Sequence, residues 1–240
     1  MNQRHAAPRG PGRRRLFTAG GGLLAALAAG SFLATDPAGR TGRSGIRQAS
    51  GKDDGTAGTG SAPVSRPPAP GWMPGAVRMP LAVNFDLGER EGQSGLVLHV
   101  QEGEGSLHEQ FSVPGAKASA HFWVGRDGLT EQYVSVHDRA WGQRAGNGAW
   151  SSVETSGFKT RPLTEAQLDA VARIYTWGAE AHGWPFAVSD RPDQAGLGTH
   201  EMGGVEWGNH ACPGPLRTAQ RTEIIRRAAA AVAGGPGRRP

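Results

Sequence analysis

The segment GLVLHV, residues 95–100, gives the clearest indication of how this chain folds. It is a short apolar run interrupted only by His99, and such a run predicts a β-strand that is buried on both faces. His99 lies near the end of the run, where a rigid element can present its side chain to a functional site. We therefore expect an interior strand that carries a histidine near its end.

Three other segments predict further strands around this one. They are LAVNFDLGE at 81–89, SAHFWVGRDGLTEQYVS at 119–135 and WSSVETSGF at 150–158. The second of them places an Arg-Asp-Gly turn between two strand-like stretches, which predicts a hairpin. All of the predicted strands therefore precede residue 160.

Beyond residue 160 the apolar pattern changes to a helical period. In LTEAQLDAVARIYTWGAEAHGW, residues 163–184, Thr164 and Gln167 fit a capping box. The apolar face of this helix holds Leu168, Val171, Ala172 and Tyr175.

GPLRTAQRTEIIRRAAAAVA, residues 214–233, predicts one more helix, which has Pro215 near its start. Its expected buried face holds Ile224, Ile225, Ala228 and Val232. Strands that come first and helices that follow predict an α/β or α+β domain, in which a central mixed β-sheet is flanked by α-helices.

The first 34 residues have the features of an export signal. Five arginines and no acidic residues precede an apolar run over 16–34, and RRLF at 14–17 resembles a twin-arginine signal. A general secretory signal and an uncleaved anchor are the alternatives. The run is short and contains four glycines, so we expect no stable membrane span in the mature protein. The expected location is outside the cell or in the cell envelope.

The rest of the chain divides by composition. Residues 35–75 are rich in Gly, Ser, Pro, Ala and Thr and predict a flexible linker, because they cannot bury enough apolar surface to fold. Residues 76–233 have the length of one ordinary domain, which we expect to be a monomer. GGPGRRP, residues 234–240, predicts a frayed tail.

The net charge of +5 suggests a nucleic-acid partner, but its distribution argues against one. Residues 76–233 hold 14 basic and 18 acidic side chains, a net charge of −4, and no basic stripe. Nucleic-acid binding needs clustered cations that displace counterions. We therefore expect no nucleic-acid partner.

Cys212 is the only cysteine of the chain, and it lies in the segment THEMGGVEWGNHACPG, residues 199–214. A single cysteine in an exported protein suggests a free thiol, an intermolecular disulfide or a special role. Thiolate and imidazole are both good zinc ligands, and a bound metal would protect the thiol from oxidation. The segment therefore predicts a metal site that includes Cys212.

Four residues compete for that site. A catalytic zinc needs three protein ligands and one open position. His99, His200, His210 and Cys212 supply several possible triads. His210 and Cys212 are two residues apart, so they would point the same way in an extended segment. Asp138 or backbone carbonyls are candidates to orient the imidazoles, and Trp207 is the best aromatic candidate for a substrate contact.

The sequence does not match the other catalytic motifs that its residues suggest. HEMGG, residues 200–204, begins like the helical zinc-protease box, but Gly204 stands where the second histidine is needed. A deaminase site needs paired cysteines, and no nucleophile-elbow serine is present. A papain-like role for Cys212 as nucleophile lacks the local signature of that family.

Four stretches together resemble a known family. LVLHVQEG, SAHFWVGRDGLTEQYV, NGAWSSVETSG and GTHEMGG…NHACPG occur in the order and rough spacing found in the zinc N-acetylmuramoyl-L-alanine amidases related to peptidoglycan recognition proteins. The resemblance covers roughly residues 79 to 230. It implies a mixed sheet flanked by helices, a substrate groove over a Zn²⁺ ion, and hydrolysis of the amide between N-acetylmuramic acid and L-alanine in peptidoglycan.

Site residues follow from the resemblance by position. It implies His99, His200 and Cys212 as zinc ligands and Glu154 as the catalytic glutamate. His210 stands where many members have a lysine or threonine that contacts the developing oxyanion.

Three departures from the family pattern affect these assignments. The gap between His200 and Cys212 is longer than usual, which leaves His210 as a rival ligand. The tripeptide Ala140–Gly142 lacks a histidine often found after its tryptophan. Ala120 replaces a tyrosine that some relatives use, which makes Glu154 more necessary.

Three classes of function remain for a chain with these features. The leading one is a zinc amidase that acts on peptidoglycan or muropeptides. The second is a recognition module that binds muropeptides without cutting them, and the presence of Cys212 favours the enzyme over it. The third is an exported metal-dependent hydrolase of another amide.

Overall fold

The computed structural model describes residues 70–234. The expected export signal over 1–34, most of the expected linker and the tail from residue 235 lie outside the described residues. The last linker residues join the domain: the Gly71 carbonyl accepts a hydrogen bond from the Val136 N–H at 3.0 Å, and the Met73 N–H donates to the Gln132 side chain at 2.7 Å. The domain therefore takes in residues slightly before position 76.

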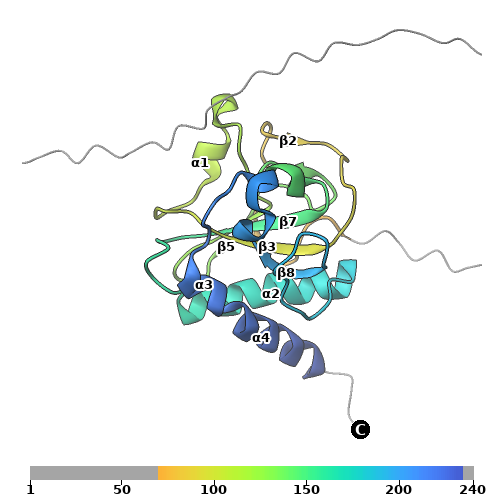
Figure 1. Ribbon diagram of the computed structural model, residues 1–240. Helices are drawn as coiled ribbons and strands as arrows, with labels where there is room; N and C mark the ends of the chain where they lie inside the picture. Colours follow the sequence, from red (N-terminus) through yellow and green to blue (C-terminus); the bar gives the residue numbers. More distant parts are fainter. Residues whose placement is uncertain (1–69, 235–240) are drawn as a thin grey trace, which may run out of the picture. The chain divides into compact units, whose positions relative to one another are not determined.

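A six-stranded mixed sheet forms the centre of the domain, in the order β1-β5-β4-β7-β3-β8 (Figure 1). Its strands are β1 (Val77–Arg78), β3 (Gly95–Val100), β4 (Phe122–Val124), β5 (Thr130–Gln132), β7 (Trp150–Thr155) and β8 (Gly196–Thr199). Only β4 and β5 pair antiparallel, and the other neighbours run parallel. The expected mixed sheet is thus confirmed.

Strand β3 is the interior strand that its apolar run predicts, and every one of its residues is buried. Leu96 and Leu98 belong to the main core beside the long helices, whereas Val97 packs with two tryptophans on the opposite face. Because side chains alternate along a strand, His99 points to the same face as Val97. That face carries the functional site.

The hairpin predicted over 119–135 is present as β4 and β5, although both strands are shorter than the pattern suggests. The early segment 81–89 is a strand only at β2 (Phe85–Asp86), which pairs with β6 (Arg139–Ala140) in a separate small sheet. Asn84 has a φ of 64° and its amide donates to the carbonyl oxygens of Phe111 and Val113, so the chain turns there.

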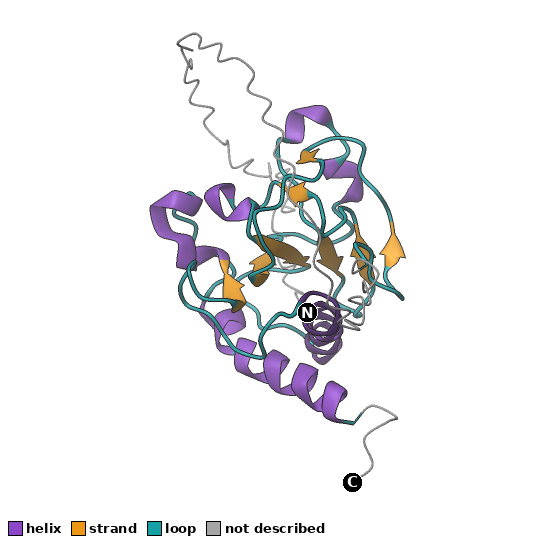
Figure 2. Cartoon of the chain, turned by 90° about the vertical axis from the view of Figure 1, so that its right-hand side faces the viewer, coloured by secondary structure: helices purple, strands orange, loops and turns teal. Residues whose placement is uncertain are grey.

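The long helix α2 (Glu165–His182) begins with the predicted capping box: the Thr164 side chain accepts from the Gln167 N–H at 3.1 Å, and the Gln167 side chain accepts from the Thr164 N–H. Its buried face contains the four expected apolar residues. Figures 1 and 2 show α2 together with α4 (Arg221–Ala233) on one side of the sheet.

The helix predicted over 214–233 is divided into α3 (Pro215–Ala219) and α4. The side chain of Gln220 lies at the break, where it accepts a hydrogen bond from the Leu163 N–H at 2.7 Å and donates to the Leu163 carbonyl at 3.2 Å. Ile224 and Ala228 are buried in the core as expected, and Ile225 packs against it while partly exposed.

Short helical segments complete the domain: α1 (His108–Phe111), η1 (Pro114–Ala116), η2 (Arg144–Asn147) and η3 (His200–Trp207). Trp207 of η3 packs against Val97 and Trp150, so η3 covers the face of the sheet opposite α2. Within residues 70–234, none of the helices combines the length and apolar character that a membrane crossing requires.

Candidate active site

Three neighbouring strands, β7, β3 and β8, run parallel and end at the same edge of the sheet. His99 and Glu154 stand opposite each other in the β3–β7 register. Thr199 stands opposite Leu98 at the end of β8, and His200 follows it directly. The sheet therefore brings together three polar side chains that are far apart in the sequence.

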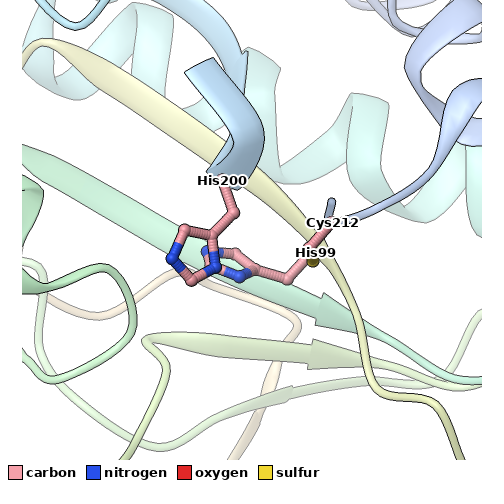
Figure 3. Close-up of side chains that lie close together, drawn as sticks. All are labelled: His99, His200 and Cys212. Carbon is pink, nitrogen blue, oxygen red and sulfur yellow. The ribbon is translucent and has the colours of Figure 1, made fainter. Parts of the chain in front are cut away.

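Cys212 completes the group from the loop before α3. One donor atom from each of His99, His200 and Cys212 lies within 4.8 Å of the others (Figure 3). The centroids of the two imidazole rings are 4.7 Å apart. The Val100 N–H donates a hydrogen bond of 3.3 Å to Cys212 Sγ, which holds the sulfur at the end of β3.

The imidazole of His200 is oriented by a backbone carbonyl. Its Nε2 lies 2.8 Å from the Trp207 oxygen, and because a carbonyl only accepts, Nε2 carries the proton. The Nδ1 atom of His200 is then unprotonated and free to bind a metal. A backbone carbonyl is thus one of the orienting groups that the sequence suggested.

The imidazole of His99 is deeply buried beside Gln143. The Nε2 atom of His99 and the Oε1 atom of Gln143 are both buried, and neither has a hydrogen-bond partner within residues 70–234. The Gln143 amide is held at its other end, where Nε2 donates to the carbonyls of Trp150 and Gly146. Nothing in the sequence singled out Gln143.

Burial controls the protonation of all three donor residues. It lowers the pKa of His99 and of His200, which favours the neutral imidazoles that bind metals. Burial also raises the pKa of the Cys212 thiol, and the nearby Glu154 carboxylate adds to that effect. A thiolate at this position therefore requires a compensating positive charge, which a bound metal ion would supply.

Glu154 lies beside this group. Its Oε1 atom is 3.8 Å from His99 Nδ1, and its side chain is 18% exposed. Burial raises the pKa of Glu154 to about 7, against an opposing influence of Arg217. A carboxyl group with such a pKa can both accept and donate a proton near neutral pH.

His210 is exposed and stacks on His200, with ring centroids 4.6 Å apart and planes inclined by 28°. It lies outside the close group of donors. The structure thus separates the two rival histidines: His200 joins His99 and Cys212, and His210 lies against the outer side of His200.

An open cavity of about 310 Å³ lies over the group. Its lining includes all five predicted site residues, together with Glu102, Gly142 and Lys159, which the sequence analysis did not select. The Lys159 N–H donates to Glu102 at 2.9 Å. These two charged side chains lie on short loops, where no sequence pattern distinguished them from solvated residues.

Two other suggestions from the sequence are wrong. The Asp138 carboxylate accepts from the Gly88 N–H, and its backbone carbonyl accepts from His121, so it orients neither His99 nor His200. Trp207 is only 3% exposed and packs in the interior, so it offers no surface to a substrate.

The donor set fits zinc. Imidazole nitrogen and thiolate sulfur are both ligands of zinc, and three protein ligands leave a fourth position open. His99, His200 and Cys212 are also the only such group within residues 70–234. The fold and the site together define a mixed α/β domain in which a cluster of possible metal ligands lines an open cavity.

The comparisons with known proteins agree with that class. The family model described as N-acetylmuramoyl-L-alanine amidase matches residues 90–215, more than half of the chain. The chain belongs to this family of amidases, which confirms the resemblance found in the sequence.

The chain is similar to several solved structures. The Staphylococcus aureus hydrolase AmiA, solved in complex with its ligand, is 16% identical with a TM-score of 0.54, over 67% of this chain and 86% of that chain. The Clostridium intestinale URNW endolysin LysCS, an N-acetylmuramoyl-L-alanine amidase, is 15% identical with a TM-score of 0.50, over 66% and 98%. A selenomethionine derivative of AmpD is 23% identical with a TM-score of 0.49, over 65% and 96%. None of the curated proteins matches the sequence.

Proposed function

We propose that the protein is a zinc-dependent amidase that hydrolyses the bond between N-acetylmuramic acid and L-alanine in bacterial peptidoglycan. The observation that carries this proposal is the grouping of His99, His200 and Cys212 within 4.8 Å, beside Glu154 and under an open cavity. Membership of the amidase family supports the same reaction.

The three donors would hold the zinc through one nitrogen of each histidine and the sulfur of Cys212. Zinc bound there would supply a Lewis acid that polarises the scissile carbonyl and makes water easier to deprotonate. The Trp207 carbonyl would keep His200 in the tautomer that binds metal, as its 2.8 Å hydrogen bond indicates.

Glu154 would act as general base and then as general acid. Its carboxylate takes a proton from the attacking water, whose oxygen bonds to the lactyl carbonyl carbon. The carbon–nitrogen bond then breaks, and Glu154 gives the proton to the nitrogen of L-alanine. The products are a lactyl carboxylic acid on the sugar and a stem peptide with a free amino terminus.

His210 would stabilise the oxyanion of the tetrahedral intermediate. It lines the cavity and its ring is held by stacking on His200. A donor aimed at the developing negative charge lowers the barrier without reorganising during the reaction. In this role His210 contacts the substrate rather than the metal.

The proposal is tested by digestion of purified peptidoglycan with the full-length protein, with zinc analysis of the same sample. The expected result is bound zinc, new N-terminal alanine on stem peptides and no new reducing ends in the glycan. Cys212→Ser is the control, and it should lose both zinc and cleavage. Cleavage of a glycosidic bond, or no cleavage by zinc-loaded protein, would refute the amidase.

The same experiment separates the alternatives. Muropeptide that is bound and released intact would indicate a recognition module. Zinc binding without wall cleavage would indicate a hydrolase of another amide. Cys212 argues against the recognition module, because a binding site alone has no need of a thiolate in a metal-type cluster.

We also propose that the protein is exported through the twin-arginine route and acts as a monomer. RRLF at 14–17 and the apolar run after it support export. Replacement of Arg14 and Arg15 by lysine should leave the protein inside the cell, whereas the unchanged chain should reach the envelope or medium. Sedimentation of the exported protein at several concentrations tests the oligomeric state.

A further inference from the structure

Arg217 is a fully buried cation close behind the site. It lies in α3, five positions after Cys212, and none of its surface is exposed. No carboxylate among the described residues forms an ion pair with it. A buried charge without a counter-charge is costly unless the surroundings supply several hydrogen bonds.

The hydrogen bonds of Arg217 all go to one short segment, residues 155–161. Its Nη1 donates to the Thr155 carbonyl at 3.1 Å, its Nη2 donates to the Ser156 carbonyl at 3.2 Å, and its Nε donates to the Arg161 carbonyl at 3.1 Å. This segment begins directly after Glu154. The guanidinium therefore joins the end of β7 and the loop after it to α3.

One hydroxyl extends this connection to β3. Thr155 Oγ1 accepts a hydrogen bond from Arg217 Nη1 and donates one to the His99 carbonyl. Arg217 is thus bonded directly to the backbone of β7 and, through the Thr155 hydroxyl, to the backbone of β3. A Cβ at Gly157, which has a φ of 108°, would lie 2.8 Å from Arg217 Nη2, so the turn there is shaped around the guanidinium.

The charge of Arg217 also suits its position. Burial lowers the pKa of the Arg217 guanidinium, and Cys212, Glu102 and Glu154 act against this by favouring its charged form. These three residues line the cavity. The buried guanidinium therefore lies behind the acidic groups that line the cavity.

We propose that Arg217 is a positioning residue that fixes Cys212, His99 and Glu154 relative to one another. It does so by tying the start of α3 to the ends of β7 and β3 through one buried guanidinium. The inference rests on the proposed function only where it concerns zinc, because the same clamp would hold the thiol in place in the metal-free protein.

The test compares Arg217→Lys with Arg221→Lys in the full-length protein. Arg221 is a suitable control, because it is also buried and its short contacts, to the Ser189 carbonyl and the Asp190 carboxylate at 2.6 Å each, involve no residue that lines the cavity. Lysine keeps the charge in both variants but cannot make the same set of hydrogen bonds. Thermal unfolding of both variants measures the structural cost of each change.

Two readouts report on the site itself. Zinc affinity, measured by competition with a chelator, should fall about 10-fold or more in Arg217→Lys and stay near the wild-type value in Arg221→Lys. In metal-free protein, the Cys212 thiol should react several-fold faster with a thiol reagent in Arg217→Lys only. The second readout needs neither zinc nor catalysis.

Thr155→Val provides a milder variant in case Arg217→Lys does not fold. It removes the hydroxyl that joins Arg217 to the His99 carbonyl and should weaken zinc binding less than Arg217→Lys. Unchanged zinc affinity and thiol reactivity in both Arg217→Lys and Thr155→Val would overturn the inference. Equal effects of Arg221→Lys would also overturn it. If the wild type binds zinc but leaves peptidoglycan intact, the proposed reaction fails while the role of Arg217 stands.

Discussion

The imidazole rings of His200 and His210 stack on each other, but His200 is buried and His210 is exposed. His200 is buried with Nε2 bonded to the Trp207 carbonyl, whereas His210 is exposed at the cavity. The ring centroids are 4.6 Å apart. We therefore expect the two histidines to have different tasks, with His200 binding the metal ion and His210 contacting the substrate.

Single alanine replacements should separate these tasks. His200→Ala is expected to lose zinc, whereas His210→Ala should keep zinc and lose kcat by roughly 100-fold, the scale of one oxyanion donor. Metal analysis and steady-state kinetics on a muropeptide check both results. Loss of zinc in His210→Ala would instead make His210 the ligand, and His200→Ala would then serve as the comparison.

Glu154→Gln should retain zinc and lose turnover. Glutamine has nearly the same shape but cannot take a proton from water, so kcat should fall by roughly 10²–10⁴-fold. Because KM reports mainly on binding, it should change much less. A variant with zinc bound and near wild-type kcat would show that another group is the base.

His121 should make stability depend on pH. The side chain is fully buried between Ser152 and the Asp138 carbonyl, and burial lowers its pKa from 6.5 to about 3. As the pH falls from about 6.5 to about 3, His121 becomes protonated in the unfolded chain but stays neutral in the folded chain. The free energy of unfolding should therefore decrease by up to about 1.4 kcal/mol per pH unit on account of this residue.

His121→Gln isolates that contribution. Glutamine supplies a donor for the Asp138 carbonyl but does not titrate in this range. Chemical denaturation of metal-free protein across the range should give a shallower pH dependence for the variant than for the wild type. Equal slopes would mean that His121 is protonated in the folded state as readily as in the unfolded one.

Gly95→Ala should destabilise the sheet next to the site. Gly95 has a φ of 146°, and a Cβ there would lie 2.0 Å from the Gly196 carbonyl oxygen of the neighbouring strand. We expect a loss of roughly 1–3 kcal/mol or more in unfolding free energy, together with weaker zinc binding, because β8 carries His200 at its end. Gly92→Ala is the control, since a Cβ at that position meets nothing within 4 Å.

The sequence predicted best those elements whose cause is local. The continuous apolar run of β3 and the capping box of α2 are both present as expected. Strand β8 escaped prediction because GLGT contains two glycines and has no strand pattern of its own. It is a strand because its backbone fits closely beside that of Gly95, and that contact spans about 100 residues of sequence.

The residues of the site also divide into those that local sequence identifies and those that depend on distant contacts. Cys212, His99 and His200 were selected from the chemistry of their side chains and from the family resemblance, and the fold places them together. Arg217 lies inside the helix predicted over 214–233 and Gln143 lies outside every predicted element, and no sequence motif marked either residue. Their roles depend on burial and on distant carbonyls, which only the folded chain defines.

The pairing of His99 opposite Glu154 has a consequence for how this centre can change. Hydrogen-bonded strands keep a separation of about 4.8 Å, so the sheet fixes the distance between the backbones of these two residues. A shift of one position along either strand would turn its side chain to the other face, beside α2. Glu154→Asp would therefore shorten the reach of the carboxylate by one methylene group while keeping it on the face of His99, which a shift of one position along the strand could not do.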